Sequence, residues 1–306
     1  MSLAAPAVSV IMPVFNRADV VGRAMASVLG QSFADFELII VDDGSSDGTA
    51  AVVESIADPR IRFLRQARNA GGNAARNRGI DEARAPLLTF LDSDDYYLPD
   101  KLAAVVAAFG ECPGLDLLID SYVKTYERPA RRGDVECRNP RLETNADVLE
   151  ALFTRKIWKA TPGISVRREA ALRAGKFAED LKRRQDFDFI LRVAAVGSCA
   201  TSDEILWVKT YSTATISADP SNFAAAMLDF YRRHPEYYDH PAYRPGFAHD
   251  LGRHFVRLLR KRRLALVARD ARLCVGTLGA GRFFGLLTHG MWRFRQRRKA
   301  LRAPKA

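Results

Sequence analysis

Three carboxylates are crowded into the segment TFLDSDDYYLPD, residues 89–100, directly after an apolar stretch. Asp92, Asp94 and Asp95 are near enough in sequence to repel one another, because like charges a few ångströms apart raise each other's pKa. A cation placed between them removes this repulsion. Hard divalent ions such as Mg²⁺ and Mn²⁺ prefer oxygen ligands of this kind. The segment therefore predicts a divalent metal site.

The spacing of the first two acids suggests that they act together. Residues i and i+2 of an extended strand project to the same side. The apolar run that precedes Asp92 is typical of a strand, and a strand that continues through Asp94 turns both carboxylates the same way. We therefore expect Asp94 and Asp92 to share one Mn²⁺ or Mg²⁺ ion.

Strand and helix patterns alternate over the first hundred residues. Near-continuous apolar runs at 8–15, 37–43, 61–65 and 86–92 are typical of strands that are buried on both faces. Apolar residues spaced as on one helical face occur within 21–29 and 102–109. This alternation predicts an α/β fold with a mostly parallel central sheet and helices on both faces. Ligands of such sheets bind at the carboxyl ends of the strands.

A polar segment follows each of the four predicted strands: PVFNR (13–17), DDGSSDGT (42–49), ARNAGGNAARN (67–77) and DSDD (92–95). Residues 43–54 match the ligand spacing of an EF-hand loop, but a strand and not a helix precedes them. The G-x-G-x-x-G of a dinucleotide-binding fold is missing after the first strand, which disfavours hydride transfer. A phosphatase with an aspartyl nucleophile stays a remote alternative, because its acids usually follow the first strand.

These motifs together resemble the family 2 glycosyltransferases, which have the Rossmann-like GT-A fold of nucleotide-diphospho-sugar transferases. The resemblance covers about residues 8–210, and several ordered motifs are more specific than any one alone. It rests on VSVIMPVFNR, ELIIVDDGSSDGT, NAGGNAARNRGI, LLTFLDSDDYYLPDKL and KFAEDLKRRQDFDFILRV.

The resemblance implies a nucleotide-binding role for several residues. Pro13, Phe15, Asn16 and Asp42 would line the nucleoside pocket, with Asp42 meeting the base, often uracil. Arg76 would lie near the base or the diphosphate. Together these residues imply a nucleotide-sugar donor, with a UDP-sugar as the first expectation.

The D-x-D pair of the family corresponds to Asp92 and Asp94 in this chain. By this resemblance Asp92 points toward the ribose or the metal, and Asp94 is the direct metal ligand. When the sugar leaves, negative charge develops on the nucleotide diphosphate, and a bound metal stabilises that charge as a Lewis acid. Arg76 would add a second cation near the same charge.

The acceptor hydroxyl must lose a proton as it attacks the anomeric carbon. In RRQDFDFILRVAAV the acids Asp186 and Asp188 begin an amphipathic helical pattern, and they are about 200° apart around a helix. One of them should therefore face the cleft and the other away from it. Family members commonly have Glu-Asp here, whose Asp is the inverting base, whereas this chain has Gln185-Asp186. We expect Asp186 to be the general base, because proton abstraction needs one positioned carboxylate.

Basic residues are concentrated near the C-terminal end. Residues 250–306 contain 16 Lys or Arg and two Asp, a net charge of +14, whereas the whole chain carries +11. Helical patterns with mixed apolar and basic residues begin near residue 221. We therefore predict a GT-A domain at 1–220 and a basic helical C-terminal region at 221–306. The Ser/Thr-rich segment 212–222 is expected to connect them and to close over the donor.

The basic region suggests a place in the cell. The first residues lack the basic segment of a secretion signal, and no run of 18 apolar residues occurs, so a cytoplasmic protein is expected. Apolar, Arg and Trp residues mixed in helices suit an anionic headgroup layer. Peripheral attachment to the inner face of the plasma membrane is the hypothesis. The alternative is a basic outer face of helices packed on the catalytic domain, and no motif supports nucleic acid as a partner.

These observations lead to one preferred function and one rival. The preferred function is an inverting, metal-dependent glycosyltransferase that acts on a saccharide or lipid-linked acceptor, as in cell-surface polysaccharide, lipopolysaccharide or glycolipid synthesis. The rival is a non-catalytic regulatory protein that binds the sugar nucleotide without transferring the sugar. A sugar nucleotidyltransferase would need a Gly-rich, basic phosphate loop after the first strand, and PVFNRADV does not supply it.

Overall fold

The computed structural model describes residues 5–126, 134–211 and 221–300. Their contacts divide the chain into two compact units, which are described separately. The α/β unit contains the described residues up to 149 together with 157–180 and 185–211, and the helical unit contains 150–156, 181–184 and 221–300. The predicted boundary at residue 220 and most of the predicted connection at 212–222 lie outside the described residues.

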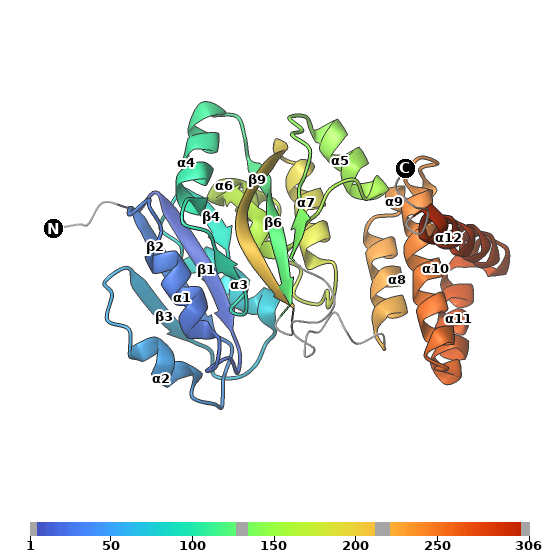
Figure 1. The fold of residues 1–306 in the computed structure, drawn as a ribbon, viewed down its shortest axis with the longest axis horizontal. Helices are drawn as coiled ribbons and strands as arrows, with labels where there is room; N and C mark the ends of the chain where they lie inside the picture. Colours follow the sequence, from blue (N-terminus) through green and yellow to red (C-terminus); the bar gives the residue numbers. More distant parts are fainter. Residues whose placement is uncertain (1–4, 127–133, 212–220, 301–306) are drawn as a thin grey trace. The chain divides into compact units, whose positions relative to one another are not determined.

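The first half of the α/β unit alternates strands and helices as predicted (Figure 1). Four strands, in the spatial order β3-β2-β1-β4, run parallel. Near-continuous apolar residues form β1, β2 and β4, which are buried along their whole length. The elements are β1 (Val8–Val14), α1 (Val21–Leu29), β2 (Phe36–Asp42), α2 (Thr49–Glu54), β3 (Ile61–Arg65), α3 (Gly72–Glu82) and β4 (Leu87–Phe90).

The second half of the unit extends the same sheet with strands of both directions. The order continues from β4 through β8, β6 and β9 to β5, and β7 pairs with β6. β8 is antiparallel to both neighbours, whereas β6 and β9 are parallel, so the sheet as a whole is mixed. The elements are β5 (Tyr96–Tyr97), α4 (Lys101–Glu111), β6 (Leu117–Tyr126), β7 (Val135–Cys137), the first half of α5 (Asn145–Thr154), a 3₁₀ turn (Thr161–Gly163), β8 (Ile164–Arg167), α6 (Arg168–Arg173), α7 (Gln185–Ala194) and β9 (Cys199–Tyr211).

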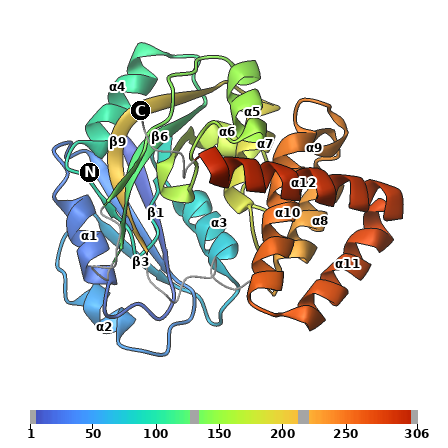
Figure 2. The same cartoon turned by 45° about the vertical axis from the view of Figure 1, so that its right-hand side comes forward.

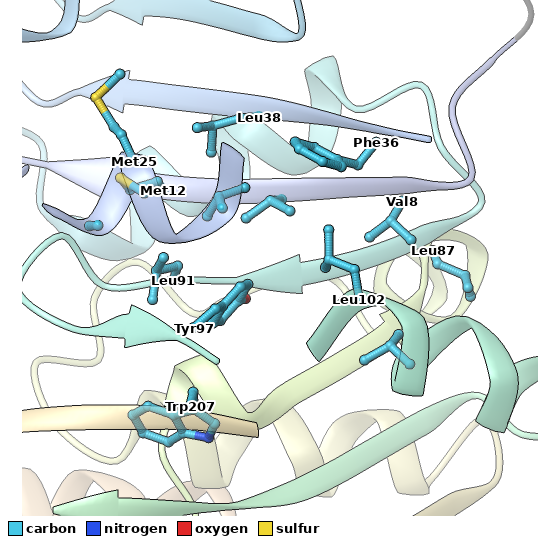
Figure 3. Packing of buried hydrophobic residues seen from close by; sticks show 14 of the residues in the cluster. Val8, Met12, Met25, Phe36, Leu38, Leu87, Leu91, Tyr97, Leu102 and Trp207 are labelled. Carbon is cyan, nitrogen blue, oxygen red and sulfur yellow. The ribbon is translucent and has the colours of Figure 1, made fainter. Parts of the chain in front are cut away.

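Helices cover both faces of the sheet, and alternation along the strands explains why. On β1, Val8, Val10 and Met12 join the core cluster that also contains apolar residues of α1 and α4 (Figure 3). Residues between them on the same strand face the other way, where α3 packs against β1 and β2. The α/β fold with helices on both faces is thereby confirmed.

The helical unit contains α8 (Phe223–Arg233), α9 (Glu236–Asp239), α10 (Arg244–Arg260), α11 (Leu264–Leu278) and α12 (Ala280–Ala300) (Figure 2). Glycines bring α10 and α12 into close contact, because a Cβ atom on Gly290 would lie on the carbonyl of Ala248 and one on Gly252 would meet the Gly290 backbone. The C-terminal helical appendage is therefore confirmed. None of the helices, over their described residues, has the length and apolar character needed to cross a membrane.

Candidate active site

The acidic segment forms a turn and not a strand. β4 ends at Phe90, and the Asp95 amide donates a hydrogen bond to the Asp92 carbonyl at 3.0 Å, which closes the turn. The expectation that the strand continues through Asp94 is therefore wrong, while the shared metal stays a prediction. The backbone changes direction here because β5 begins at Tyr96 and pairs with β9.

Two cations face the carboxylates of this turn. Arg76 is buried on α3, and its Nη2 atom lies 2.6 Å from Asp92 Oδ1. Lys209 of β9 places Nζ 3.6 Å from Oδ2 of the buried Asp95, whose Oδ1 accepts a hydrogen bond from the Thr210 amide at 2.8 Å. The turn thus combines three carboxylates with an arginine and a lysine from elements far away in the sequence. We refer to Asp92, Asp94, Asp95, Arg76 and Lys209 as the acidic rim.

The electrostatics of the acidic rim are unbalanced. Burial acts to raise the pKa of Asp92, but the charges of Arg76 and Lys209 outweigh it and lower this pKa. The pKa of Asp94 is raised by burial and by the Asp92 charge. Burial also raises the pKa of Asp95, to about 8, despite the nearby Lys209. The raised pKa values of Asp94 and Asp95 mean that these two carboxyl groups keep a proton more readily than usual, so the cations of the rim do not fully stabilise three negative charges.

The chemistry of the rim fits an added divalent cation. Oδ2 of Asp95 is buried and, among the described residues, has no hydrogen-bond partner. Carboxylate oxygens that lack compensation are suitable ligands for Mg²⁺ or Mn²⁺. In the described part of the chain, no group of three or more His, Cys, Asp or Glu side chains is arranged to hold a metal by itself. Substrate oxygens and water would have to complete the coordination sphere.

The loops after β1 and β2 hold each other in place. Asn16 has a left-handed backbone conformation (φ 50°), which asparagine tolerates better than most residues. The backbone amide of Asn16 donates a hydrogen bond to Ser45 Oγ at 2.9 Å, and its side-chain Oδ1 atom accepts one from the Ser46 backbone amide at 2.9 Å. The side chain of Asp42 is completely buried, with Oδ1 accepting from the Ser45 amide at 2.9 Å. The predicted residues Asn16 and Asp42 therefore belong to one network.

The other two predicted nucleoside residues lie on the same part of the sheet. Pro13 is buried within β1, opposite Val41 of β2. Phe15 follows the end of β1, and its side chain is 40% exposed. The structure thus places Pro13, Phe15, Asn16 and Asp42 at the carboxyl ends of β1 and β2, while their contacts with a nucleotide stay a prediction.

Asp43 performs a role that sequence reasoning missed. Its carboxylate accepts hydrogen bonds from the Ala70 and Gly71 amides at 2.7 and 2.8 Å and from Gln66 Nε2 at 2.8 Å. Gly44 must be glycine here, because it has φ +78° and a Cβ atom would meet the Arg68 carbonyl carbon at 2.9 Å. Asp43 thereby fixes the loop that leads into α3 and so positions Arg76. The adjacent acids Asp42 and Asp43 in the sequence VDDG are the feature that could have indicated this role.

Helix α7 separates the two candidate bases, as the angle between them predicts. Asp188 is buried and forms an ion pair with Arg192 at 2.7 Å. Asp186 lies in the first turn, and its Oδ2 atom is 3.3 Å from Lys159 Nζ. Lys159 also lies over the Phe187 ring, 4.5 Å from its centre. Lys159 was not predicted, because 27 residues separate it from its partner and no motif contains it.

One lysine connects the base candidate with the acidic rim. Burial acts to lower the pKa of Lys209, but the charges of Asp95, Asp92, Asp94 and Asp186 outweigh it and raise this pKa. Asp186 is therefore an electrostatic neighbour of the three rim carboxylates around one ammonium group. A carboxylate next to an acid-rich, cation-compatible turn at the strand ends is the arrangement expected of a nucleotide-diphospho-sugar transferase with the GT-A fold.

Comparison with known proteins agrees with this class. Residues 9–173 match the family model described as "Glycosyl transferase family 2". This match covers more than half of the chain, and the chain therefore belongs to glycosyl transferase family 2. The membership predicted from the strand-end motifs is confirmed.

Two curated relatives are similar to this chain over about 110 residues each. The succinoglycan biosynthesis protein ExoO of Rhizobium meliloti is 38% identical over 116 residues, which cover 38% of this chain and 33% of ExoO. The GalNAc(5)-diNAcBac-PP-undecaprenol beta-1,3-glucosyltransferase of Campylobacter jejuni is 40% identical over 109 residues, 35% of each chain. The chain thus spans only about a third of the length of these two relatives.

Solved structures support the fold over almost the whole chain. S. aureus TarS 1-349 in complex with UDP-GlcNAc has a TM-score of 0.62 and 19% identity, over 96% of this chain and 91% of TarS 1-349. The mannosyltransferase PcManGT from Pyrobaculum calidifontis, in complex with GDP-Man and Mn²⁺, has a TM-score of 0.58 and 18% identity, over 94% and 88% of the two chains. At these identities the likeness establishes the fold alone.

Proposed function

We propose that the protein is an inverting, metal-dependent glycosyltransferase that moves a sugar from a nucleotide-diphosphate donor, with UDP as the favoured nucleotide, to a hydroxyl of a saccharide or lipid-linked acceptor. The observation that carries the proposal is the position of Asp186 beside the acidic rim, where Asp186 and the three rim carboxylates act on the same lysine, Lys209. Family membership supports the chemistry, and the UDP-GlcNAc complex of TarS supports the kind of donor.

The donor would bind across the carboxyl ends of β1, β2 and β4. The network of Asn16 and Asp42 offers polar atoms for the base, and the exposed Phe15 offers an apolar surface for the nucleoside. Arg76 is held by its contact with Asp92, and a buried guanidinium suits recognition of phosphate oxygens. Pro13 supports this surface from within β1.

Asp94 and Asp92 are the residues that would hold Mn²⁺ or Mg²⁺ together with the donor diphosphate. Such an ion supplies Lewis-acid stabilisation of the charge that develops on the leaving nucleotide diphosphate. The Mn²⁺ in the PcManGT complex is consistent with this class of cofactor. Lys209 would limit the repulsion among the rim carboxylates before the donor binds.

Asp186 would act as the general base in one displacement. The acceptor oxygen forms a bond to the anomeric carbon while the bond between that carbon and the phosphate oxygen breaks. The proton of the acceptor hydroxyl passes to Asp186, and the bonding electrons leave with the nucleotide diphosphate. A single displacement inverts the anomeric configuration, and Lys159 keeps the Asp186 carboxylate in position.

The acceptor class follows from the relatives and from charge. ExoO is named for succinoglycan biosynthesis, and the Campylobacter jejuni relative is named for an undecaprenol-linked acceptor. Residues 250–306 carry a net charge of +14, which favours an anionic membrane surface as a partner. We therefore place the protein in the cytoplasm, attached peripherally to the inner face of the plasma membrane, in synthesis of a cell-surface polysaccharide, lipopolysaccharide or glycolipid precursor.

The test compares two aspartates of α7. Asp186→Asn should lower kcat by about 10²–10⁴-fold, because the proton acceptor is lost, while thermal stability and UDP binding stay as in the wild type. Asp188→Asn should instead lower the melting temperature, because it leaves Arg192 without its buried partner, and its kcat at low temperature should stay close to wild type. Release of UDP from a panel of UDP-sugars with Mn²⁺ measures kcat.

Either of two results would contradict the proposal. Full turnover by Asp186→Asn would remove Asp186 from the base role. A wild-type protein that binds UDP-sugars tightly but never releases UDP with any acceptor would favour the rival, a regulatory protein that binds sugar nucleotides without catalysis.

A further inference from the structure

The helical unit contains a cavity that the proposed sugar transfer does not use. Its volume is about 520 Å³, which is within the range of small-molecule sites. The first residues of α10 and one face of α12 form its walls, since the lining positions of α12 are spaced three or four apart. The lining residues are Pro241, Arg244, Pro245, Ala248, Arg282, Gly285, Leu286 and His289.

The polar part of the cavity suits an anion. It contains the side chains of Arg244, Arg282 and His289, and among the described residues that line it none is acidic. Arg282 is held in place by an ion pair with Asp239 and by a hydrogen bond from Nη1 to the Tyr231 hydroxyl at 3.1 Å. An oriented guanidinium with a second one nearby matches the geometry of phosphate oxygens.

The remaining part of the cavity suits a lipid. Two prolines, Ala248 and Leu286 give it an apolar side. Trp292 is 57% exposed on the same helix, with its ring centre 6.1 Å from that of His289. Tryptophan is favoured where an apolar phase meets polar headgroups. A phosphate site with an exposed tryptophan at its edge therefore combines the two features that a phospholipid presents.

We propose that this cavity binds the phosphate of an anionic membrane lipid headgroup. The guanidinium groups of Arg244 and Arg282 contact the phosphate, and Trp292 lies among the headgroups. This inference rests on the peripheral attachment proposed above and does not depend on the chemistry at Asp186. The membrane would then be bound at a defined site, in addition to the general attraction between basic helices and an anionic surface.

A charge-neutral pair of variants tests the site. A side chain at Gly285 would enter the cavity, since Gly285 lines it and a Cβ atom there meets nothing within 4 Å. Gly276 on α11 is equally open but does not line the cavity. Leucine is a better helix former than glycine, so Gly285→Leu and Gly276→Leu should both fold. Neither changes the net charge.

Binding is measured by co-sedimentation with phosphatidylcholine vesicles that contain or lack phosphatidylglycerol, and by thermal shift with inorganic phosphate. We expect Gly285→Leu to weaken binding to the phosphatidylglycerol vesicles at least about fivefold, the effect of one basic contact at such a surface. Gly276→Leu should bind like the wild type. Arg244→Gln should lose more affinity than Arg272→Gln, which removes the same charge from α11 outside the cavity.

Equal binding by the two leucine variants would overturn the site, even if the wild type binds the vesicles. Stabilisation by inorganic phosphate without vesicle binding would overturn the lipid as the source of the phosphate. The Asp186→Asn protein should bind vesicles like the wild type, so a failure of the proposed sugar transfer and a failure of the lipid site give different results.

Discussion

Two of the places where the α/β unit buries carboxylates differ in how the carboxylates are paired with cations. In the interior, Asp120 of β6 forms an ion pair with Lys101 of α4, and neither side chain is exposed to solvent. At the acidic rim, Arg76 and Lys209 form ion pairs with Asp92 and Asp95, whereas Asp94 has no ion pair among the described residues. The first place is balanced one to one, while at the second place one carboxylate lacks an ion pair within the described part of the chain.

This difference separates a structural role from a functional one. A balanced pair in the interior gains nothing from a ligand, because no atom of it reaches solvent. An unbalanced rim at the strand ends is destabilised until a cation arrives, and a site that binds a charged substrate must accept that cost before binding. Removal of one charge should therefore destabilise the fold at the interior pair. At the acidic rim it should leave the fold stable and weaken ligand binding.

The largest effect is expected at the balanced pair. Lys101→Met keeps a side chain of similar length but leaves Asp120 buried without its cation. We expect the free energy of unfolding to fall by about 3–5 kcal/mol, the usual cost of breaking a buried pair. Chemical denaturation measures it, and Lys101→Met/Asp120→Asn should recover part of the loss. A Lys101→Met protein as stable as the wild type would show that the pair has no structural role.

The same pair predicts a dependence of stability on pH. Burial raises the pKa of Asp120 from 3.8 to about 6, more than Lys101 lowers it. The folded state therefore binds this proton more tightly than the unfolded state, and the free energy of unfolding should fall as the pH rises through this window. In Lys101→Met the charge that lowers the pKa of Asp120 is lost, so the stability should continue to fall at higher pH than in the wild type. The stability difference between wild type and Lys101→Met should thus be smallest at acidic pH, which denaturation at several pH values can check.

At the acidic rim, loss of a charge should leave the fold intact and harm ligand binding. Asp94→Asn removes one of the like charges that raise the pKa of Asp95, so the melting temperature should stay the same or rise. Binding of UDP in the presence of Mn²⁺ should weaken at least about tenfold, because support of the metal is lost. Calorimetric titration with Mn²⁺ and with a chelator separates the two contributions.

A matched variant and a contrary result complete this test. Asp203→Asn, in an exposed ion pair with Arg141, removes the same charge and should leave UDP binding unchanged. If Asp94→Asn bound UDP and Mn²⁺ as tightly as the wild type does, Asp94 would have no role in metal binding.

The two places also differ in how far the sequence predicts them. The rim was predictable because its acids are adjacent in the chain and follow an apolar strand. Its turn was not, because the end of β4 depends on the pairing of β5 with β9, more than 100 residues later. Asp120 and Lys101 were missed for a related reason. Lys101 follows Pro99 and Asp100 at a helix start, a pattern typical of a solvent-exposed lysine, and only the packing of α4 buries it.

Helix α7 shows what local periodicity predicts well. The angle between Asp186 and Asp188 separated an outward from an inward carboxylate without any tertiary information. Their partners differ in this respect, since Arg192 lies one turn along the same helix, whereas Lys159 comes from a distant loop. Periodicity thus predicts that the two acids face different ways, but neither which of them is available nor the cation that holds it.

The smallest effect is expected at Lys159, which forms an ion pair with the partly exposed carboxylate of Asp186. Lys159→Met should lower kcat about tenfold, or about 1.4 kcal/mol in activation free energy, because the ammonium group no longer holds the Asp186 carboxylate in position. KM for the donor should change little. Lys159→Arg should restore most of the activity, and Lys156→Met, which removes an exposed lysine paired with Glu150, should have no effect. A loss of activity that arginine does not rescue, together with a lower melting temperature, would mean that Lys159 supports the fold and does not position Asp186.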